Sequence, residues 1–254
     1  MPDSSADSSA LAFRAAIEML AEATPGAHHE LRAHGTLLAI TGAMIPALNP
    51  ILSPAAEPDV DEIVALAEVA GREAGRSPWS IRIRDEPHAK LVEVAQRSGL
   101  STKATQPFMV RSLDGEPSAG EIPVRRLAGR DYAEFAAVLG AGFGVPAEII
   151  SGVFTEQVLD HPQITAYIAD SDNGVAAAAA IAFVTDRHLG MANFVWLPEL
   201  HGPDYGGAVI EASLRDGRAA GAHTAYVHAT DSLVPYFETF GFTTREHWSM
   251  LSAF

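Results

Sequence analysis

A segment rich in glycine, proline, serine and acidic residues, LDGEPSAG at 113–120, divides the sequence into two halves of similar layout. Such a composition between two strand-like segments is typical of a linker. The chain has 254 residues, which suits one large domain or two smaller ones. We therefore predict an N-terminal domain at residues 1–115 and a C-terminal domain at residues 121–254.

The N-terminal half mixes strand and helix patterns. Asp59 precedes an apolar helical pattern and Glu62 follows three residues later, which is the spacing of a capping box. The alternating SIRIR at 80–84 predicts a half-buried strand. The predicted elements are a helix at 11–23 after a frayed polar tail, two strands within 35–53, a helix at 59–75, the strand at 80–84, a helix at 87–98 and a strand at 103–113.

The C-terminal half predicts more strands and a long helix. The turn Asp172-Asn173-Gly174 between two apolar runs indicates a β-hairpin. The predicted elements are a strand at 122–127, a helix at 131–141 capped by Asp131, a helix at 146–159, strands at 164–169, 175–184 and 191–197, a helix at 205–220, a strand at 224–229, a short helix at 233–240 and a strand at 242–251.

The charge of the chain restricts its partners. The formal net charge is −15, and Lys90 and Lys103 are its only lysines. Nucleic-acid affinity depends on Lys and Arg displacing counterions, so we expect no nucleic-acid partner. The acidic balance favours a well-solvated surface, or a field that attracts cationic substrates such as amines.

Several other classes are excluded by composition. The absence of cysteine excludes disulfides, thiolate zinc sites and cysteine nucleophiles, and the histidines show no metal spacing, so we expect no metal. The polar, acidic N-terminus lacks the features of a signal peptide, and the apolar run at 174–184 is too short to span a membrane. We expect no membrane association and a cytoplasmic location.

Two stretches of the C-terminal half resemble the GNAT acetyltransferase superfamily. They are NFVWLPELHGPDYGGA at 193–208, followed by a helix and a strand, and PYFETFGF at 235–242. The N-terminal half is similar to the degenerate first lobe of tandem-GNAT proteins, through GAMIPALN at 42–49 and residues 77–79 and 99–109. The resemblance implies an α/β (α+β) GNAT acyl-CoA acyltransferase fold, with a central mixed twisted sheet flanked by helices in two related lobes.

The resemblance also implies a site for acetyl-CoA or another acyl-CoA. The family's loop has the pattern Arg/Gln-x-x-Gly-x-Gly/Ala, in which main-chain N–H groups at a helix start bind the pyrophosphate. Aligned on Pro198, this pattern places His201, Asp204 and Gly206 at its key positions, and only Gly206 matches. Asp204 either opposes the phosphates or simply caps the helix. The implied cofactor-binding residues are Val195, Leu197, His201, Gly202, Asp204, Tyr205, Gly206, Gly207, Asp231 and Phe237.

The implied reaction is acyl transfer to an amine of a small molecule or peptide. The tyrosine that acts as general acid in the family falls on Phe237, so the neighbouring Tyr236 is the candidate acid, or else a packing aromatic. His228, at a strand end, is the candidate base or a structural histidine. A catalytically degenerate binding protein and another thioester reaction on the same fold remain alternatives. A homodimer is one possible assembly.

Overall fold

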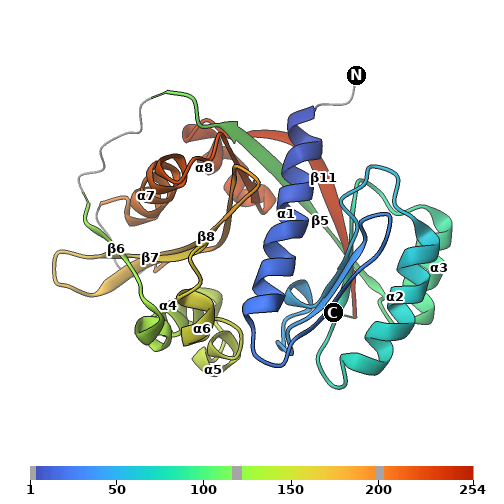
Figure 1. The fold of residues 1–254 in the computed structure, drawn as a ribbon. Helices are drawn as coiled ribbons and strands as arrows, with labels where there is room; N and C mark the ends of the chain where they lie inside the picture. Colours follow the sequence, from blue (N-terminus) through green and yellow to red (C-terminus); the bar gives the residue numbers. More distant parts are fainter. Residues whose placement is uncertain (1–3, 116–121, 198–202, 254) are drawn as a thin grey trace. The chain divides into compact units, whose positions relative to one another are not determined.

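The computed structural model describes residues 4–115, 122–197 and 203–253. The chain forms two compact units, Met1–Arg111 with His228–Phe254, and Ser112–Val227. Each unit packs helices on a mixed β-sheet (Figure 1), which confirms the predicted fold class. The predicted linker lies partly outside the described residues. The predicted division differs from these units at the C-terminus, because the last strand pairs with two strands of the first unit.

The first unit contains a sheet in the order β1-β2-β3-β4-β11-β5. All neighbours are antiparallel except β3 and β4, which are parallel. The two strands predicted within residues 35–53 are β2 and β3. The strands are β1 (His28–Leu31), β2 (Leu37–Ile40), β3 (Pro50–Leu52), β4 (Ser80–Arg84), β5 (Thr102–Ser112) and β11 (Thr243–Ser252).

Helices cover both faces of this sheet (Figure 1). Leu37 and Ala39 of β2 pack with Ala21 of the first helix, whereas Leu38 and Ile40 face the opposite core. That core lies under the second and third helices, because alternate residues of a strand point to opposite faces. The helices are α1 (Ser4–Ala23), the 3₁₀ turn η1 (Pro46–Leu48), α2 (Val60–Glu73), α3 (Ala89–Arg97), the 3₁₀ turn η3 (Asp231–Leu233) and α8 (Val234–Thr239).

Two predictions for the first unit are corrected. The tail predicted at residues 1–10 is largely helical, since α1 begins at Ser4 and Asp7 forms an ion pair with Arg84. Strand β4 is buried on both faces rather than half-buried, because it lies between β3 and β11 with helices on either side. Asp59 caps α2 as predicted, but Glu62 instead accepts hydrogen bonds from the N–H groups of residues 34 and 36.

The second unit contains a sheet in the order β10-β9-β8-β7-β6, with only β9 and β10 parallel. The predicted hairpin is confirmed, with Gly174 at φ +73° in its turn. The helix predicted at 146–159 is two short helices, and Thr155 caps the second. The elements are β6 (Val124–Arg126), η2 (Gly129–Asp131), α4 (Tyr132–Phe143), α5 (Ala147–Ser151), α6 (Glu156–Leu159), β7 (Ile164–Asp170), β8 (Ala176–Thr185), β9 (His188–Trp196), α7 (Tyr205–Ala219) and β10 (Thr224–His228).

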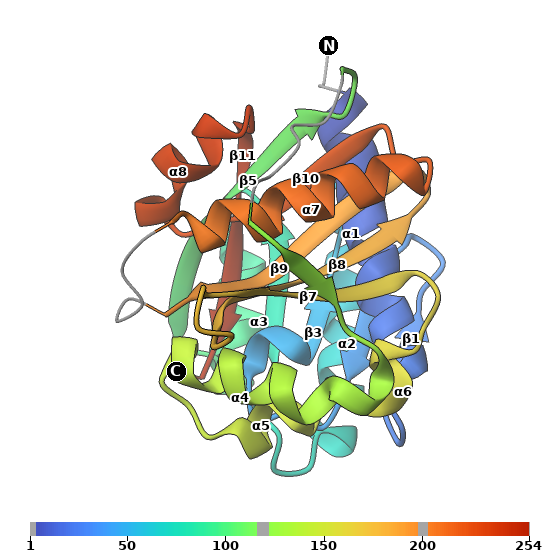
Figure 2. The same cartoon turned by 90° about the vertical axis from the view of Figure 1, so that its left-hand side faces the viewer.

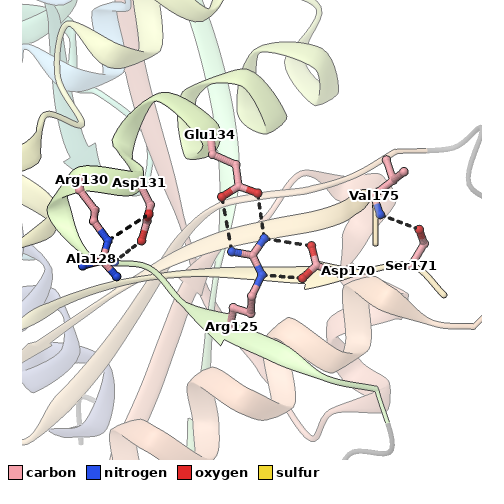
Figure 3. A network of polar contacts seen from close by, with 8 residues as sticks. All are labelled: Arg125, Ala128, Arg130, Asp131, Glu134, Asp170, Ser171 and Val175. Atoms are coloured by element: carbon pink, nitrogen blue, oxygen red, sulfur yellow. Dashed lines mark hydrogen bonds and ion pairs between the residues drawn. The ribbon is translucent and has the colours of Figure 1, made fainter. Parts of the chain in front are cut away.

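Arg125 links three elements at the outer end of this sheet. Its guanidinium, on β6, donates to Glu134 of α4 and to Asp170 of β7 (Figure 3). These carboxylates raise the pKa of Arg125, Asp170 more than Glu134. The side chains are partly exposed, so solvent screens the pairs and their contribution to stability is small. The network fixes the edge strand against α4 and β7.

Candidate functional site

The pairing between β9 and β10 stops before β9 ends. The parallel register runs from Thr224 opposite His188 to Val227 opposite Met191, yet β9 continues to Trp196. On its other edge β9 stays paired with β8 as far as Trp196. The β9–β10 register therefore ends five residues before β9 does.

A β-bulge lies where this pairing stops. Ala179 and Ile181 of β8 face Val195 and Ala192 of β9, so Asn193 and Phe194 together oppose one residue of β8. Asn193 has φ +51°, a left-handed conformation that asparagine tolerates better than most residues. The bulge is not among the features predicted from the sequence, where an asparagine within an apolar strand is its one visible signal.

The bulge reverses which face of the sheet the later side chains meet. Before it, Leu189 packs on α7, where a Cβ on Gly217 would lie 2.8 Å from the leucine side chain. After it, Val195 packs on α4, where a Cβ on Gly142 would lie 2.6 Å from the valine Cβ. Helices α7 and α4 cover opposite faces of this sheet (Figures 1 and 2). In a regular strand Leu189 and Val195, six residues apart, would point to the same face of the sheet. Because of the bulge they point to opposite faces.

The end of β9 carries two aromatic rings. The ring centroids of Phe194 and Trp196 lie 5.4 Å apart, and Trp196 is 42% exposed. Trp196 therefore does not fill the core. Leu197, predicted to contact the cofactor, directly follows and is half-buried, with its N–H bonded to the carbonyl of Ala177. The predicted contacts His201 and Gly202 lie outside the described residues.

At the start of helix α7, the N–H groups of Tyr205, Gly207 and Ala208 are bonded within the chain. The carboxylate of Asp204 accepts from the N–H of Gly207 at 2.8 Å, and its carbonyl accepts from Ala208 at 3.1 Å. The N–H of Tyr205 donates to the carbonyl of Pro203. Gly206 and Gly207 are buried in the first turn. Asp204 thus performs the capping role that was one of its two interpretations.

The remaining predicted residues belong to the first unit, whereas Val195, Leu197 and the start of α7 belong to the second. Asp231 is exposed at the start of η3. Phe237 is 1% exposed and packs edge-on against Phe242, with ring centroids 5.6 Å apart. Tyr236 is half-buried, and its ring lies 5.3 Å from that of Phe240.

His228 is enclosed by aromatic rings of the first unit. Its ring centroid lies 4.5 Å from that of Phe13, 4.7 Å from Phe108 and 5.2 Å from Trp248. Burial, and then the charge of Arg82, hold the pKa of His228 well below its usual value. The imidazole is therefore neutral at pH 7 and weakly basic.

The described part of the chain holds no group of three or more His, Cys, Asp or Glu residues placed to bind a metal ion. None of its helices has the length and hydropathy needed to cross a membrane.

The second unit combines a parallel strand pair that ends close to a bulge with a following helix whose first turn contains two glycines. No family model matches the sequence, and no curated protein matches it either. The likeness to solved structures is extensive: a GCN5-related N-acetyltransferase from Kribbella flavida superposes with a TM-score of 0.66 over 96% of this chain and 95% of its own, at 15% identity.

Two further solved structures are similar over most of the chain. A functionally unknown conserved protein from Staphylococcus epidermidis has a TM-score of 0.61 at 12% identity, covering 89% of this chain and 94% of its own. A GCN5-related N-acetyltransferase from Sphaerobacter thermophilus has a TM-score of 0.54 at 11% identity, covering 89% and 76%. The predicted resemblance to GNAT proteins is thus confirmed as a shared fold.

Proposed function

We propose that this chain is an acyl-CoA-dependent N-acyltransferase, which transfers an acetyl or related acyl group to an amine of a small molecule or peptide. The observation that carries the proposal is the interrupted edge of β9. Its pairing with β10 ends at Met191, and the bulge at Asn193 follows directly. A strand that continues past the end of its neighbour offers an edge to which an extended ligand with amide groups of its own can add.

The strand side of this site fits the pantetheine arm of acetyl-CoA. That arm carries two amides, which would pair with the main chain of β9 beyond Met191. When bound, acetyl-CoA supplies an activated thioester. A main-chain N–H of β9 would then polarise the carbonyl oxygen as negative charge develops there. The C–N bond forms as the C–S bond breaks, the nitrogen loses one proton and the departing sulfur gains one.

The helix side fits less well. Gly206 and Gly207 are small enough for phosphate oxygens to approach the main chain. However, Asp204 already accepts the N–H of Gly207 and adds a negative charge at the same helix end. We therefore expect CoA to bind through its pantetheine arm more than through its pyrophosphate.

The proposed reaction does not require a side chain that is a strong acid or a strong base. The low pKa of His228 makes it a poor base, so we propose that the amine attacks in its neutral form. Tyr236 remains the candidate acid for the departing thiolate. Proximity supplies much of the rate in such a reaction, which tolerates imperfect acid and base groups.

Calorimetry with CoA and acetyl-CoA tests the proposal on the full chain. We expect micromolar binding to the wild type. Asn193→Gly retains the left-handed backbone and should retain binding. Asn193→Val disfavours that conformation and should weaken binding by about 5- to 150-fold, since strain at such a position costs about 1–3 kcal/mol. No heat of binding at millimolar acetyl-CoA would reject the proposal.

A second candidate function is a GNAT-fold binding protein without catalysis. It is favoured by the carboxylate of Asp204 at the helix start, together with the fully buried Phe237 where the family has its acid. Thiol release from acetyl-CoA, measured against a panel of primary amines, separates the two. Binding without thiol release supports the binding protein. Thiol release without an acylated amine indicates another thioester reaction.

A further inference from the structure

Two aromatic side chains at the end of β9 lie on the face of the sheet that α7 covers. Val195 packs on α4, and neighbouring residues of a strand point to opposite faces, so Trp196 points to the α7 face. The ring of Phe194 lies beside it, with the two ring centroids 5.4 Å apart. Trp196 is 42% exposed and Phe194 is half-buried, so the indole is the outer ring of the pair.

Helix α7 begins over this same end of the sheet. It connects the parallel strands β9 and β10, so it runs back along the sheet against the direction of β9 (Figure 2). Near its end, Gly217 packs on Leu189 at the start of β9. From Gly217 back to Tyr205 the helix extends about 18 Å. From Leu189 to Trp196 the strand extends about 23 Å. The first turn of α7 and the Trp196 ring therefore lie near one another on one face.

The start of α7 is where the pyrophosphate of acyl-CoA would lie, and the adenosine of CoA is attached to that pyrophosphate. The carboxylate of Asp204 accepts the N–H of Gly207 and adds a negative charge, so this helix end gives little affinity for phosphates. An adenine ring is neutral, and a carboxylate does not repel it as it repels a phosphate. Every base also has a flat π surface that stacks on aromatic side chains.

Trp196 is well placed among the exposed rings of the second unit. Of the phenylalanines and tryptophans described there, Phe143 at the end of α4 is the other exposed one. Helix α4 covers the opposite face of the sheet, so Phe143 lies away from the start of α7 (Figures 1 and 2). The indole of Trp196 is therefore the aromatic surface that a nucleotide at this helix start would meet.

We propose that Trp196, with Phe194 packed beside it, is the surface on which the adenine ring of acyl-CoA stacks. The inference rests on the proposed function and extends it, because it assigns the affinity for the nucleotide half of the ligand to an aromatic ring. The same contact sets specificity. A pantetheine arm on a carrier protein has a phosphate but no adenine, so Trp196 favours free acyl-CoA over carrier-bound thioesters.

Calorimetry on the full chain with CoA and with pantetheine, which lacks the nucleotide, tests this assignment. Trp196→Ala should weaken CoA binding by about 5- to 150-fold, the range for one stacked base, and should leave the Kd for pantetheine unchanged. Trp196→Phe retains a ring and should lose less. Phe143→Ala is the matched control, since it removes a ring that is 47% exposed, and it should change neither Kd.

Tryptophan fluorescence gives a second readout that the wild-type protein supplies by itself. A stacked adenine quenches indole emission, so CoA should lower the emission and pantetheine should not. The variant Trp196→Phe retains Trp79 and Trp248, and CoA should no longer lower its emission.

The outcomes separate this inference from the proposed function. CoA that binds Trp196→Ala as tightly as the wild type, or that leaves the wild-type emission unchanged, would overturn the stacking and leave the transferase proposal standing. Equal losses for CoA and pantetheine would also overturn it, and would place the indole against the pantetheine arm. No binding of CoA to the wild type rejects both.

Discussion

Replacing Asp204 by asparagine isolates the charge at the start of α7 from the cap that it provides. Asparagine caps helices as well as aspartate does, so its side-chain oxygen should still accept the N–H of Gly207. The free energy of unfolding in urea should therefore change by less than about 0.5 kcal/mol. Asp204→Ala, which removes both charge and cap, should cost about 1 kcal/mol.

The expected gain in CoA affinity follows from the exposure of this carboxylate. Two like charges at about 4 Å repel by about 1 kcal/mol in water and by about 4 kcal/mol at an effective dielectric constant of 20. Asp204 is exposed, so the lower value applies to each charge of a pyrophosphate. Asp204→Asn should then tighten CoA binding by about 1–2 kcal/mol, or roughly 5- to 30-fold.

Calorimetry at low and high salt tests whether the gain in CoA affinity arises from removing the charge of Asp204. The gain should shrink at high salt, because ions screen exposed charges beyond about 3 Å at 1 M. Pantetheine, which has no pyrophosphate, should bind the wild type and Asp204→Asn equally. A Kd for CoA that is the same in both proteins at low salt would show that the pyrophosphate does not lie near the start of α7.

Three further substitutions test the packing and charges of each unit. Gly190→Ala places a Cβ about 2.3 Å from the hydroxyl oxygen of Tyr226, and chemical unfolding should show a loss of about 1–3 kcal/mol. Arg84→Met leaves the carboxylate of Glu246 buried without its cation and should cost about 3–5 kcal/mol, and a change below 1 kcal/mol would contradict the pairing. The pKa of His34 is raised above 6.5, chiefly by the hydrogen bond to the aspartate that caps α2. The interaction of His34 with this aspartate stabilises the fold fully below pH 6.5, and the stabilisation is lost as the pH rises through the folded-state pKa. The Tm should therefore fall over this pH range, and His34→Ala should reduce the fall.

Local signals in the sequence determined most elements of the fold. The residues 172–174 form the predicted hairpin turn, since glycine readily supplies the positive φ that the turn needs. Asp59 caps α2 because the capping bonds lie within three residues of it. The helix from Tyr205 likewise follows its own cap at Asp204. Each of these features depends on neighbours along the chain.

The tertiary structure decided the features that involve distant residues. The alternation at 80–84 predicts a half-buried strand, but α1 covers the face that carries the arginines, and the side chain of Glu246 on β11 also contacts Arg84 there. The sequence also leaves open which sheet the last strand joins, because strand pairing depends on partners far away in the chain. The bulge at Asn193 is decided in the same way, since it exists only relative to the register of β8. The periodicity of a sequence shows which residues of a segment share a face. Only the packed structure shows what covers each face.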